Sequence, residues 1–331
     1  MNLNRLAPAL ASLLLLIGAL PPFAAAQKIN TAYISTTPGT STVIQVAKDM
    51  RIFDKHGIDA TVIFISGSVR GIQSILAGEI PIGEGGGPAL ASARLAGGDI
   101  VALAGNVNVL PYYLVSHPSI KKPEDLKGKI GGTHIAGTTA EFALKVGLKK
   151  IGLDPLKDTS LRVIGGTLER MVALQKGIVQ FTVVTEAGKA QAERLGYPTV
   201  VDMVALQIAF PQNGIYTSTK LIRENPDLIR RYMRAYTEAI HYYKTHKEET
   251  MKIMRKYSRV DDRKFLEEAW DWHAKFMPDA PYPPAAGYQL VLQEMAERNP
   301  KAAQANVKDY IDTRFIKELE DSGFIKALYR K

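Results

Sequence analysis

Two short loops of small, hydroxyl-bearing residues stand where an anion could be held. Ser66-Gly67-Ser68 and Gly137-Thr138-Thr139 each come directly before a segment with helical spacing of apolar residues. The first backbone N–H groups of a helix have no partner within the helix and carry partial positive charge, and Ser and Thr hydroxyls add donors. Both loops therefore predict contact with a ligand, an anion above all. Ordinary capping of the helix is the structural alternative, and a residue can do both.

One glycine-rich turn could bring the backbone close to a ligand. Gly85-Gly86-Gly87 follows a predicted strand. Glycine permits close approach and positive φ, so we expect ligand contact at Gly85 and Gly86, with a purely structural turn as the alternative. The triplet is not a phosphate-binding loop, because no Gly-Lys-Ser/Thr follows it, nor does it fit the dinucleotide pattern G-x-G-x-x-G.

Three ionisable side chains are further candidates. Arg70 lies in the first turn of its helix and could make a bidentate contact with a carboxylate or sulfonate; an exposed salt bridge is the alternative. Glu186 follows a strand end, where a carboxylate would select a ligand amine or ring N–H. His134 lies near another strand end and could contact ligand or make a structural hydrogen bond.

No pattern in the chain indicates catalysis or a resident cofactor. The His, Asp and Glu residues show no metal-ligand spacing, and no local motif indicates a Ser-His-Asp triad. The 331 residues include no cysteine, which excludes disulfide scaffolds, cysteine-ligated zinc, iron–sulfur clusters and thiol nucleophiles. We therefore expect a protein that is not an enzyme and needs no metal or cofactor.

The elements around residues 47–83 explain how such loops could be positioned. A helix, a β-branched strand at Ala60 to Ile65, a second helix and a strand at Ile80 to Gly83 follow one another. Alternating units of this length predict a parallel sheet, and ligands bind beyond the carboxyl ends of such strands. The loop at 66–68 occupies that position, which predicts a small-molecule site.

A second block of the same kind begins at about Asp125, and the chain is helical after about residue 218. Leu228, Tyr232, Tyr236, Ala239 and Tyr243 form one helical stripe, for which core packing is expected. We predict an α/β protein of two lobes with a central cleft and C-terminal helices. The second lobe, 117–212, would be inserted into the first, 27–116 and 213–331.

Residues 1–26 have the pattern of a secretory signal peptide. Arg5 is their only charged residue, an apolar run spans Leu6 to Leu20, and Ala24-Ala25-Ala26 offers a cleavage site before Gln27. A retained membrane anchor is the alternative, although Pro21-Pro22 interrupts the apolar run. We expect cleavage after about Ala26 and a periplasmic mature protein without a transmembrane helix.

The net charge of +9 is largely local. Residues 220–260 hold eleven Lys or Arg against five Asp or Glu, spaced along helices. A solvated helix face is the simplest interpretation, and docking to a membrane or an acidic partner is the alternative. No nucleic-acid-binding motif is present, so nucleic acid is not an expected partner.

Several segments, in this order, resemble a known family. They are IFDKHGID (52–59), LAGEIPIG (76–83), LAGGDIVALAG (95–105), PEDLKGKIGG (123–132), ALQKGIVQ (173–180) and ENPDLIRRYMRAYTEAI (224–240). The chain resembles the periplasmic substrate-binding proteins of ABC importers for nitrate, sulfonates and taurine. Binding proteins for thiamine-pyrimidine precursors and the fungal synthase of that pyrimidine belong to the same superfamily.

The resemblance implies a type II periplasmic-binding-protein fold that closes on its ligand by hinge motion. It also implies loops facing the cleft, at Ser35, Thr36, Thr37, Ser66, Gly67, Ser68, Gly85 to Gly87, Gly137, Thr138, Thr139, Gly166, Thr167, Glu186 and Asn213 to Tyr216. The first loop lacks the aromatic residues common in sulfonate binders. This departure argues against assigning taurine or an alkanesulfonate specifically.

The resulting hypothesis is a monomeric solute-binding protein that captures a small anionic or zwitterionic organic molecule, such as a sulfonate, a carboxylate or a pyrimidine-like compound. Its partners would be an ABC permease and the ATPase of that permease. Two alternatives stay open. One is an enzyme on the same fold, like the pyrimidine synthase, which depends on a cysteine-rich segment that this chain lacks. The other is a ligand sensor that signals to a membrane receptor.

Overall fold

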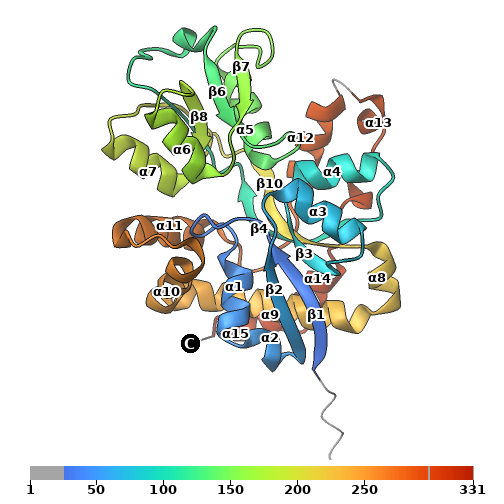
Figure 1. The fold of residues 1–331 in the computed structure, drawn as a ribbon. Helices are drawn as coiled ribbons and strands as arrows, with labels where there is room; N and C mark the ends of the chain where they lie inside the picture. Colours follow the sequence, from blue (N-terminus) through green and yellow to red (C-terminus); the bar gives the residue numbers. More distant parts are fainter. Residues whose placement is uncertain (1–25, 297–298, 331) are drawn as a thin grey trace, which may run out of the picture.

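The computed structural model describes residues 26–296 and 299–330, which form two lobes stacked one above the other (Figure 1). The predicted signal peptide, apart from Ala26, lies outside the described residues. Within the described part, no helix combines the length and the apolarity needed to cross a membrane.

The first lobe is built on a five-stranded mixed sheet in the order β2-β1-β3-β10-β4. Its strands are β1 (Gln27–Tyr33), β2 (Ile58–Phe64), β3 (Ile82–Gly85), β4 (Val101–Val109) and β10 (Ala209–Thr217). β1 pairs in parallel with β2 and β3, whereas β10 runs antiparallel to β3 and β4. The parallel part is the α/β arrangement expected from residues 47–83, and the returning strand β10 makes the sheet mixed.

The second lobe repeats this plan in the order β7-β6-β8-β5-β9. Its strands are β5 (Tyr113–Ser116), β6 (Ile130–Thr133), β7 (Ser160–Val163), β8 (Phe181–Val184) and β9 (Thr199–Asp202). β6 is parallel to β7 and β8, and β5 is antiparallel to β8 and β9. Each sheet therefore has one antiparallel strand beside the point where the chain changes lobes.

The chain crosses between lobes a few residues earlier than the sequence predicts. β5 pairs with β8 and β9 of the second sheet, so residues 113–116 do not belong with the first lobe. β10 already pairs with β4 at Ala209, so residues 209–212 do not belong with the second. Hydrogen bonding to a neighbouring strand decides this, and local composition does not reveal it. We propose lobe boundaries at the two crossings, 110–112 and 203–208.

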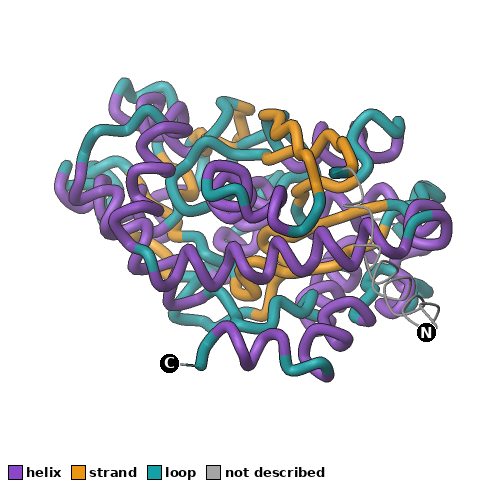
Figure 2. Tube along the Cα trace, turned by 90° about the horizontal axis from the view of Figure 1, so that it is seen from below, coloured by secondary structure: helices purple, strands orange, loops and turns teal. Residues whose placement is uncertain are grey.

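Helices flank both sheets (Figure 1). In the view from below, helices also lie across the strands of the first lobe (Figure 2). Those of the second lobe are η1 (Pro123–Leu126), α5 (Thr139–Lys150), α6 (Thr167–Gln175) and α7 (Glu186–Arg194). The N-terminal part of the first lobe contributes α1 (Thr42–Asp49), α2 (Ile52–Lys55), α3 (Ser68–Leu76) and α4 (Gly87–Leu95). Its C-terminal part contributes α8 (Thr219–Glu224), α9 (Pro226–Thr245), α10 (Lys247–Ser258), α11 (Arg263–Phe276), α12 (Ala285–Ala296), α13 (Pro300–Ala303), η2 (Val307–Asp309), α14 (Arg314–Asp321) and α15 (Phe324–Leu328).

The long helix α9 shows how the sequence builds the core of the first lobe. Asn225 caps it by accepting a hydrogen bond from the Leu228 N–H at 3.1 Å, and Pro226 occupies the first turn, where its missing N–H costs nothing. The predicted stripe on this helix is buried, which confirms its assignment to the core. One of its phenols, Tyr232, lies against the first sheet, where its hydroxyl makes a hydrogen bond with Thr31 Oγ1 of β1 at 2.7 Å.

Candidate ligand-binding site

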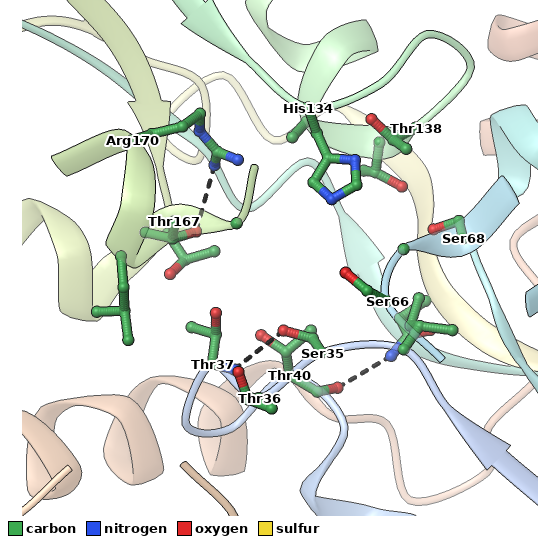
Figure 3. A pocket seen from close by; sticks show the side chains of 18 of the residues that line it. Ser35, Thr36, Thr37, Thr40, Ser66, Ser68, His134, Thr138, Thr167 and Arg170 are labelled. Carbon is green, nitrogen blue, oxygen red and sulfur yellow. Dashed lines mark hydrogen bonds between the residues drawn. The ribbon is translucent and has the colours of Figure 1, made fainter. Parts of the chain in front are cut away.

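A polar cavity of about 130 Å³ lies between the two lobes (Figure 3). Its lining comes from the ends of β1 and β2 and the start of α3 on one side, and from the loops that lead into α5 and α6 on the other. It thus lies beyond the carboxyl ends of parallel strands, as expected for an α/β site. Since a protein cavity of ~150 Å³ holds benzene, the space suits a molecule no larger than about one aromatic ring.

Most residues predicted from the sequence come together at this cavity. Its lining includes Ser35, Thr36, Thr37, Ser66, Gly67, Ser68, Thr138, Thr139, Gly166, Thr167 and Asn213. They come from both lobes and from loops far apart in the sequence. Their contact with a ligand stays a prediction, but their juxtaposition is a property of the fold.

Five predicted residues lie outside the lining: Arg70, Gly85, Gly86, Gly137 and Glu186. Arg70 is exposed on α3, and it has no ion-pair partner among the described residues. Gly137 lines neighbouring grooves outside this cavity. The first residue of α7, Glu186, lies beside the Tyr113 hydroxyl, and burial together with this carboxylate raises the pKa of that phenol.

Gly85, at the end of β3, and Gly86, directly after it, both lie in closely packed surroundings. A Cβ on Gly85 would stand 2.7 Å from Ile72 Cδ1, inside the core of the first lobe. A Cβ on Gly86 would stand 2.5 Å from Thr139 Oγ1 and 2.9 Å from Ser68 Oγ. Gly86 therefore lets the lining hydroxyls of the two lobes approach each other. Tyr216, which the resemblance placed at the cleft, is fully buried behind it.

Arg170 of α6 is the strongest charge at the cavity. Its side chain is only 1% exposed, and protein oxygens hold the guanidinium in place. Nη1 donates to the Gly165 carbonyl at 2.6 Å, and Nη2 donates to the Val183 carbonyl at 3.0 Å and to Thr167 Oγ1 at 3.3 Å. Each Nη carries two N–H groups, so one Nη1 donor has no acceptor among the described residues.

The positive charge of Arg170 forms no ion pair with a carboxylate of the described residues, although the carboxylate of Glu169, the preceding residue, also lines the cavity and acts to raise the pKa of the guanidinium against the lowering by burial. No Asp or Glu among the described residues forms an ion pair with Arg170, and the carbonyls and hydroxyls that anchor it are uncharged. Burial lowers the pKa of the guanidinium, but an arginine keeps its proton in proteins. Since buried charges are normally paired, the cavity beside Arg170 favours an anionic occupant.

His134 adds a hydrogen-bond donor to the cavity, and a backbone contact determines which ring nitrogen carries the proton. The N–H of Ile135 donates to His134 Nδ1 at 2.9 Å, so Nδ1 carries no proton and a neutral ring must carry it on Nε2. Burial, followed by the charges of Arg170 and Arg70, lowers the pKa of His134. The ring is therefore neutral at pH 7. Figure 3 shows it pointing into the space between Ser66 and Thr167, where Nε2–H is available as a donor.

The loop of residues 35–41 has hydroxyl groups that accept hydrogen bonds from its own backbone and so keep their protons for donation. The Thr37 N–H donates to Ser35 Oγ at 3.0 Å, and the Ser35 N–H donates to Ser41 Oγ at 3.2 Å. A hydroxyl that accepts from the backbone keeps its own proton for another acceptor. Asn213 holds the same loop by donating to the Thr40 carbonyl at 2.9 Å. Ser35 can thus donate into the cavity from a fixed position.

The helix N-termini at the cavity differ in how they are capped. The Thr138 side chain accepts a hydrogen bond from the Glu141 N–H at 3.4 Å, so the capping alternative applies at α5. Gly67 and Gly166 are the N-cap residues of α3 and α6, and neither helix has a side-chain cap. The first backbone N–H groups of α6 therefore lack a side-chain cap beside Arg170, although the Glu169 carboxylate lies near Gly166. Uncapped N–H groups of this kind can bind an anion.

One wall of the cavity is apolar. Phe64, at the end of β2, is 45% exposed and packs on Tyr33 with ring centroids 5.2 Å apart. Leu168 lines the cavity from α6 and also packs against Phe265 of α11. A ligand here meets donors on one side and an exposed aromatic face on another.

The two lobes also contact each other on both sides of the cavity. Arg194 of α7 pairs with Glu268 of α11 at 3.1 Å, next to the Leu168–Phe265 contact. On the opposite side, Lys149 of α5 pairs with Glu294 of α12 at 2.6 Å.

The sequence carries a recognisable family signature over most of its length. The sequence model of the family described as NMT1/THI5 like matches residues 40–250. The chain belongs to the NMT1/THI5-like family. A curated protein of Brucella abortus, described as a candidate binding protein, is 26% identical to it over 269 residues, which cover 76% of this chain and 78% of that protein.

Solved structures share the fold of this NMT1/THI5-like protein. The periplasmic nitrate-binding protein NrtA from Synechocystis PCC 6803 superposes with a TM-score of 0.73 at 15% identity, over 90% of this chain and 89% of that one. The alkanesulfonate-binding protein SsuA from Xanthomonas axonopodis pv. citri, bound to MOPS, gives 0.68 at 14% identity, over 86% and 96%. The architecture is therefore that of periplasmic binding proteins, as the sequence predicted.

Several lining residues of this NMT1/THI5-like protein were not singled out from the sequence: Ile34, Thr40, Phe64, Tyr112, Ala140, Leu168, Glu169, Arg170, Thr185 and Gln212. Arg170 did leave a signal, because it falls on the same face of α6 as Thr167 and Leu174, both buried. A cation on the buried stripe of a helix requires a partner, and that partner can be a ligand. In residues 26–296 and 299–330, no three His, Asp or Glu side chains gather to hold a metal ion.

Proposed function

We propose that this chain is an exported solute-binding protein that captures a small organic anion between its two lobes by hinge closure. The observation that carries the proposal is the Arg170 guanidinium, buried beside the inter-lobe cavity without a carboxylate partner. The proposal includes release of the mature protein to the periplasm, where it would act as a monomer and deliver its ligand to an ABC permease and the ATPase of that permease.

The donors around the cavity support an anion more than any other ligand. Arg170 Nη1, His134 Nε2–H, the Ser35 hydroxyl and the uncapped N-terminus of α6 come from both lobes. An anion placed among them would receive hydrogen bonds from each lobe, and would therefore stabilise the closed form over an open one.

The apolar wall defines the rest of the ligand. Phe64 and Leu168 offer a surface for a ring or a short hydrocarbon, and the volume of about 130 Å³ limits the body to about that size. Small carboxylates and sulfonates with one ring or a short chain fit both limits. The resemblance to nitrate- and sulfonate-binding proteins points to the same chemical class.

Binding without chemistry is the simplest use of these groups. Nδ1 of His134 accepts from a backbone N–H, so no carboxylate orients the ring as one does in a catalytic triad. The hydroxyl-bearing residues serve as donors in the arrangement described above. We therefore propose capture and release of an unaltered ligand.

A binding screen with matched analogues tests the proposal. The purified mature protein would be titrated calorimetrically with nitrate, methanesulfonate, benzoate and benzenesulfonate, and with the uncharged benzamide and the cationic benzylamine. We expect at least one anion to bind, and the uncharged and cationic analogues not to bind. Absence of binding by every anion, or equal binding of benzamide and benzoate, would contradict the proposal.

A pair of arginine variants tests the role of the charge. Arg170→Gln should abolish anion binding, because it removes the only buried cation of the described cavity lining. Arg162→Gln, on the exposed face of β7 in the same lobe, should leave binding unchanged. Because Arg170 also anchors protein carbonyls, His134→Phe serves as a second variant and should weaken binding while leaving those anchors intact.

A further inference from the structure

Glu84 of β3 is a fully buried carboxyl group that the proposed function does not use. It is 0% exposed, and no Lys, Arg or His among the described residues forms an ion pair with it. Neither carboxyl oxygen has a hydrogen-bond partner of normal geometry in the described part of the chain. A carboxylate in such a place would be strongly destabilised, because a buried charge needs a partner.

The groups around Glu84 are neutral, and they belong to residues that form the cavity wall. The Ser41 hydroxyl, the Asn213 amide and the Ile34 N–H lie close to the carboxyl. Ile34 and Asn213 also line the cavity, and Ser41 holds the backbone of Ser35. One layer of side chains therefore separates Glu84 from the space in which an anion would sit.

The titratable groups that face Glu84 are all phenols. Tyr33 comes from β1, Tyr216 from β10, and Tyr232 and Tyr236 from α9; burial is the main cause, and proximity to Glu84 a further one, of the raised pKa of each. All four stay protonated below pH 10. They cannot compensate a negative charge on Glu84, and none of them changes charge in the physiological range.

We propose that Glu84 determines the affinity of the pocket for anions through its own charge: the protonated carboxyl permits an anion to bind, and the ionised carboxylate weakens binding. This inference rests on the proposed function, because it concerns the ligand of the same cavity. The physical reason is Coulomb repulsion between two like charges separated by one layer of protein with low polarisability.

The relevant pH range follows from the burial of Glu84. Burial is the largest cause of a pKa raised from 4.5 to about 8, and the neighbouring Ser41, Asn213 and Ile34 moderate the rise. Below that pH the pocket holds a neutral carboxyl, and above it the carboxylate forms. By linkage, a bound anion favours the protonated form, so binding takes up protons near pH 8.

Glu84→Gln tests the inference, since the amide has the size of the carboxyl but no charge. Methanesulfonate, benzoate and benzenesulfonate are suitable probes because their own charge is constant between pH 6 and 10. For the wild type we expect the dissociation constant to rise about tenfold between pH 7 and 9.5. For Glu84→Gln we expect an unchanged dissociation constant over this range. A wild-type profile that is flat, or one that the variant reproduces, would overturn the inference.

A measurement on the wild type alone keeps the test decisive if Glu84→Gln does not fold. Titration of the best-binding probe at pH 8.5, in two buffers of different ionisation enthalpy, gives the number of protons taken up on binding. We expect a fraction of one proton, and zero protons would overturn the inference. Failure of every probe to bind at any pH would overturn the proposed function itself. Binding with the same affinity at pH 7 and 9.5 would overturn only the role of Glu84.

Discussion

The imidazole of His134 lies against the backbone of Gly67 across the boundary between the lobes. A Cβ built on Gly67 would stand 2.7 Å from His134 Cε1, closer than real side chains approach, and Gly67 has a φ of +87°. The absence of a side chain at Gly67 therefore permits His134 of the second lobe to lie this close to the first lobe while facing the cavity. Glycine at this position allows the contact between the lobes as well as the local backbone geometry.

Gly67→Ala should impair closure more than folding. The added methyl group would displace the His134 ring, whose Nδ1 is held by the backbone, and with it the Nε2–H donor. We expect anion affinity to fall more than tenfold. We also expect a loss of about 1–3 kcal/mol in the free energy of unfolding, because a φ of +87° with a ψ of 147° is a conformation that essentially only glycine adopts. Gly78→Ala is the matched control, because Gly78 has a φ of +78° but nothing within 4 Å of its Cβ position. Equal affinities of the two variants, measured by calorimetry, would contradict this role of Gly67.

Phe64→Ala should distinguish ring-containing ligands from small ones. The exposed ring contributes apolar area and stacking, so we expect benzoate and benzenesulfonate to bind about five- to tenfold more weakly. Methanesulfonate should bind with unchanged affinity, because it does not reach an aromatic platform. Leu76→Ala, at a residue 42% exposed outside the cavity, is the control. A uniform loss for all three anions would show that Phe64 supports the shape of the pocket instead of contacting a ring.

The Arg194–Glu268 pair should bias the equilibrium between open and closed forms. It joins the lobes beside the cavity, but the side chains are 36% and 28% exposed, so its contribution is modest. We expect Arg194→Ala or Glu268→Ala to weaken anion binding about two- to fivefold, and the charge-swapped double variant to recover much of this loss. Arg255→Ala removes an ion pair with Asp261 inside the first lobe and should leave affinity unchanged. Small-angle scattering should show a larger radius of gyration for Arg194→Ala than for Arg255→Ala.

His273 should make the protein less stable in mild acid. Burial lowers the pKa of this ring to about 4, while its hydrogen bond with the Ala269 carbonyl opposes the shift. The unfolded chain binds the proton near pH 6.5 and the folded protein resists it, so stability is fully present above 6.5 and is lost as the pH falls towards 4. The loss is at most about 3 kcal/mol.

Urea unfolding at pH 7, 5.5 and 4.5 measures this loss. His273→Gln should flatten the decline in the free energy of unfolding between these pH values relative to the wild type. His117→Gln, at the surface of the second lobe, is the control and should not change the slope. An identical pH dependence in the wild type and His273→Gln would contradict the assignment.

Much of the fold and part of the site could be predicted because they depend on local patterns. The stripe from Leu228 to Tyr243 predicts a buried helix face, and Ser66 to Ser68 predicts a polar loop at a strand end. Both follow from the periodicity of side chains within one element. The strand pairings favour crossings between the lobes a few residues earlier than the sequence predicts. Tyr113 has the pattern of an extended residue in either lobe, and only its pairing with Val184 assigns it to the second sheet.

The sequence by itself determined that the chain forms alternating strands and helices, with hydroxyl-rich loops at strand ends and no cysteine chemistry. These properties follow from residue types and short-range spacing. Only the tertiary structure decided that Arg170 faces the cavity without an ion pair among the described residues, that Glu84 lies behind the cavity wall without one, and that the His134 ring packs against Gly67. Each of these depends on which segments, distant along the chain, become neighbours. Charge and close approach act through space, so the chemistry of this site arises from the way the two lobes meet.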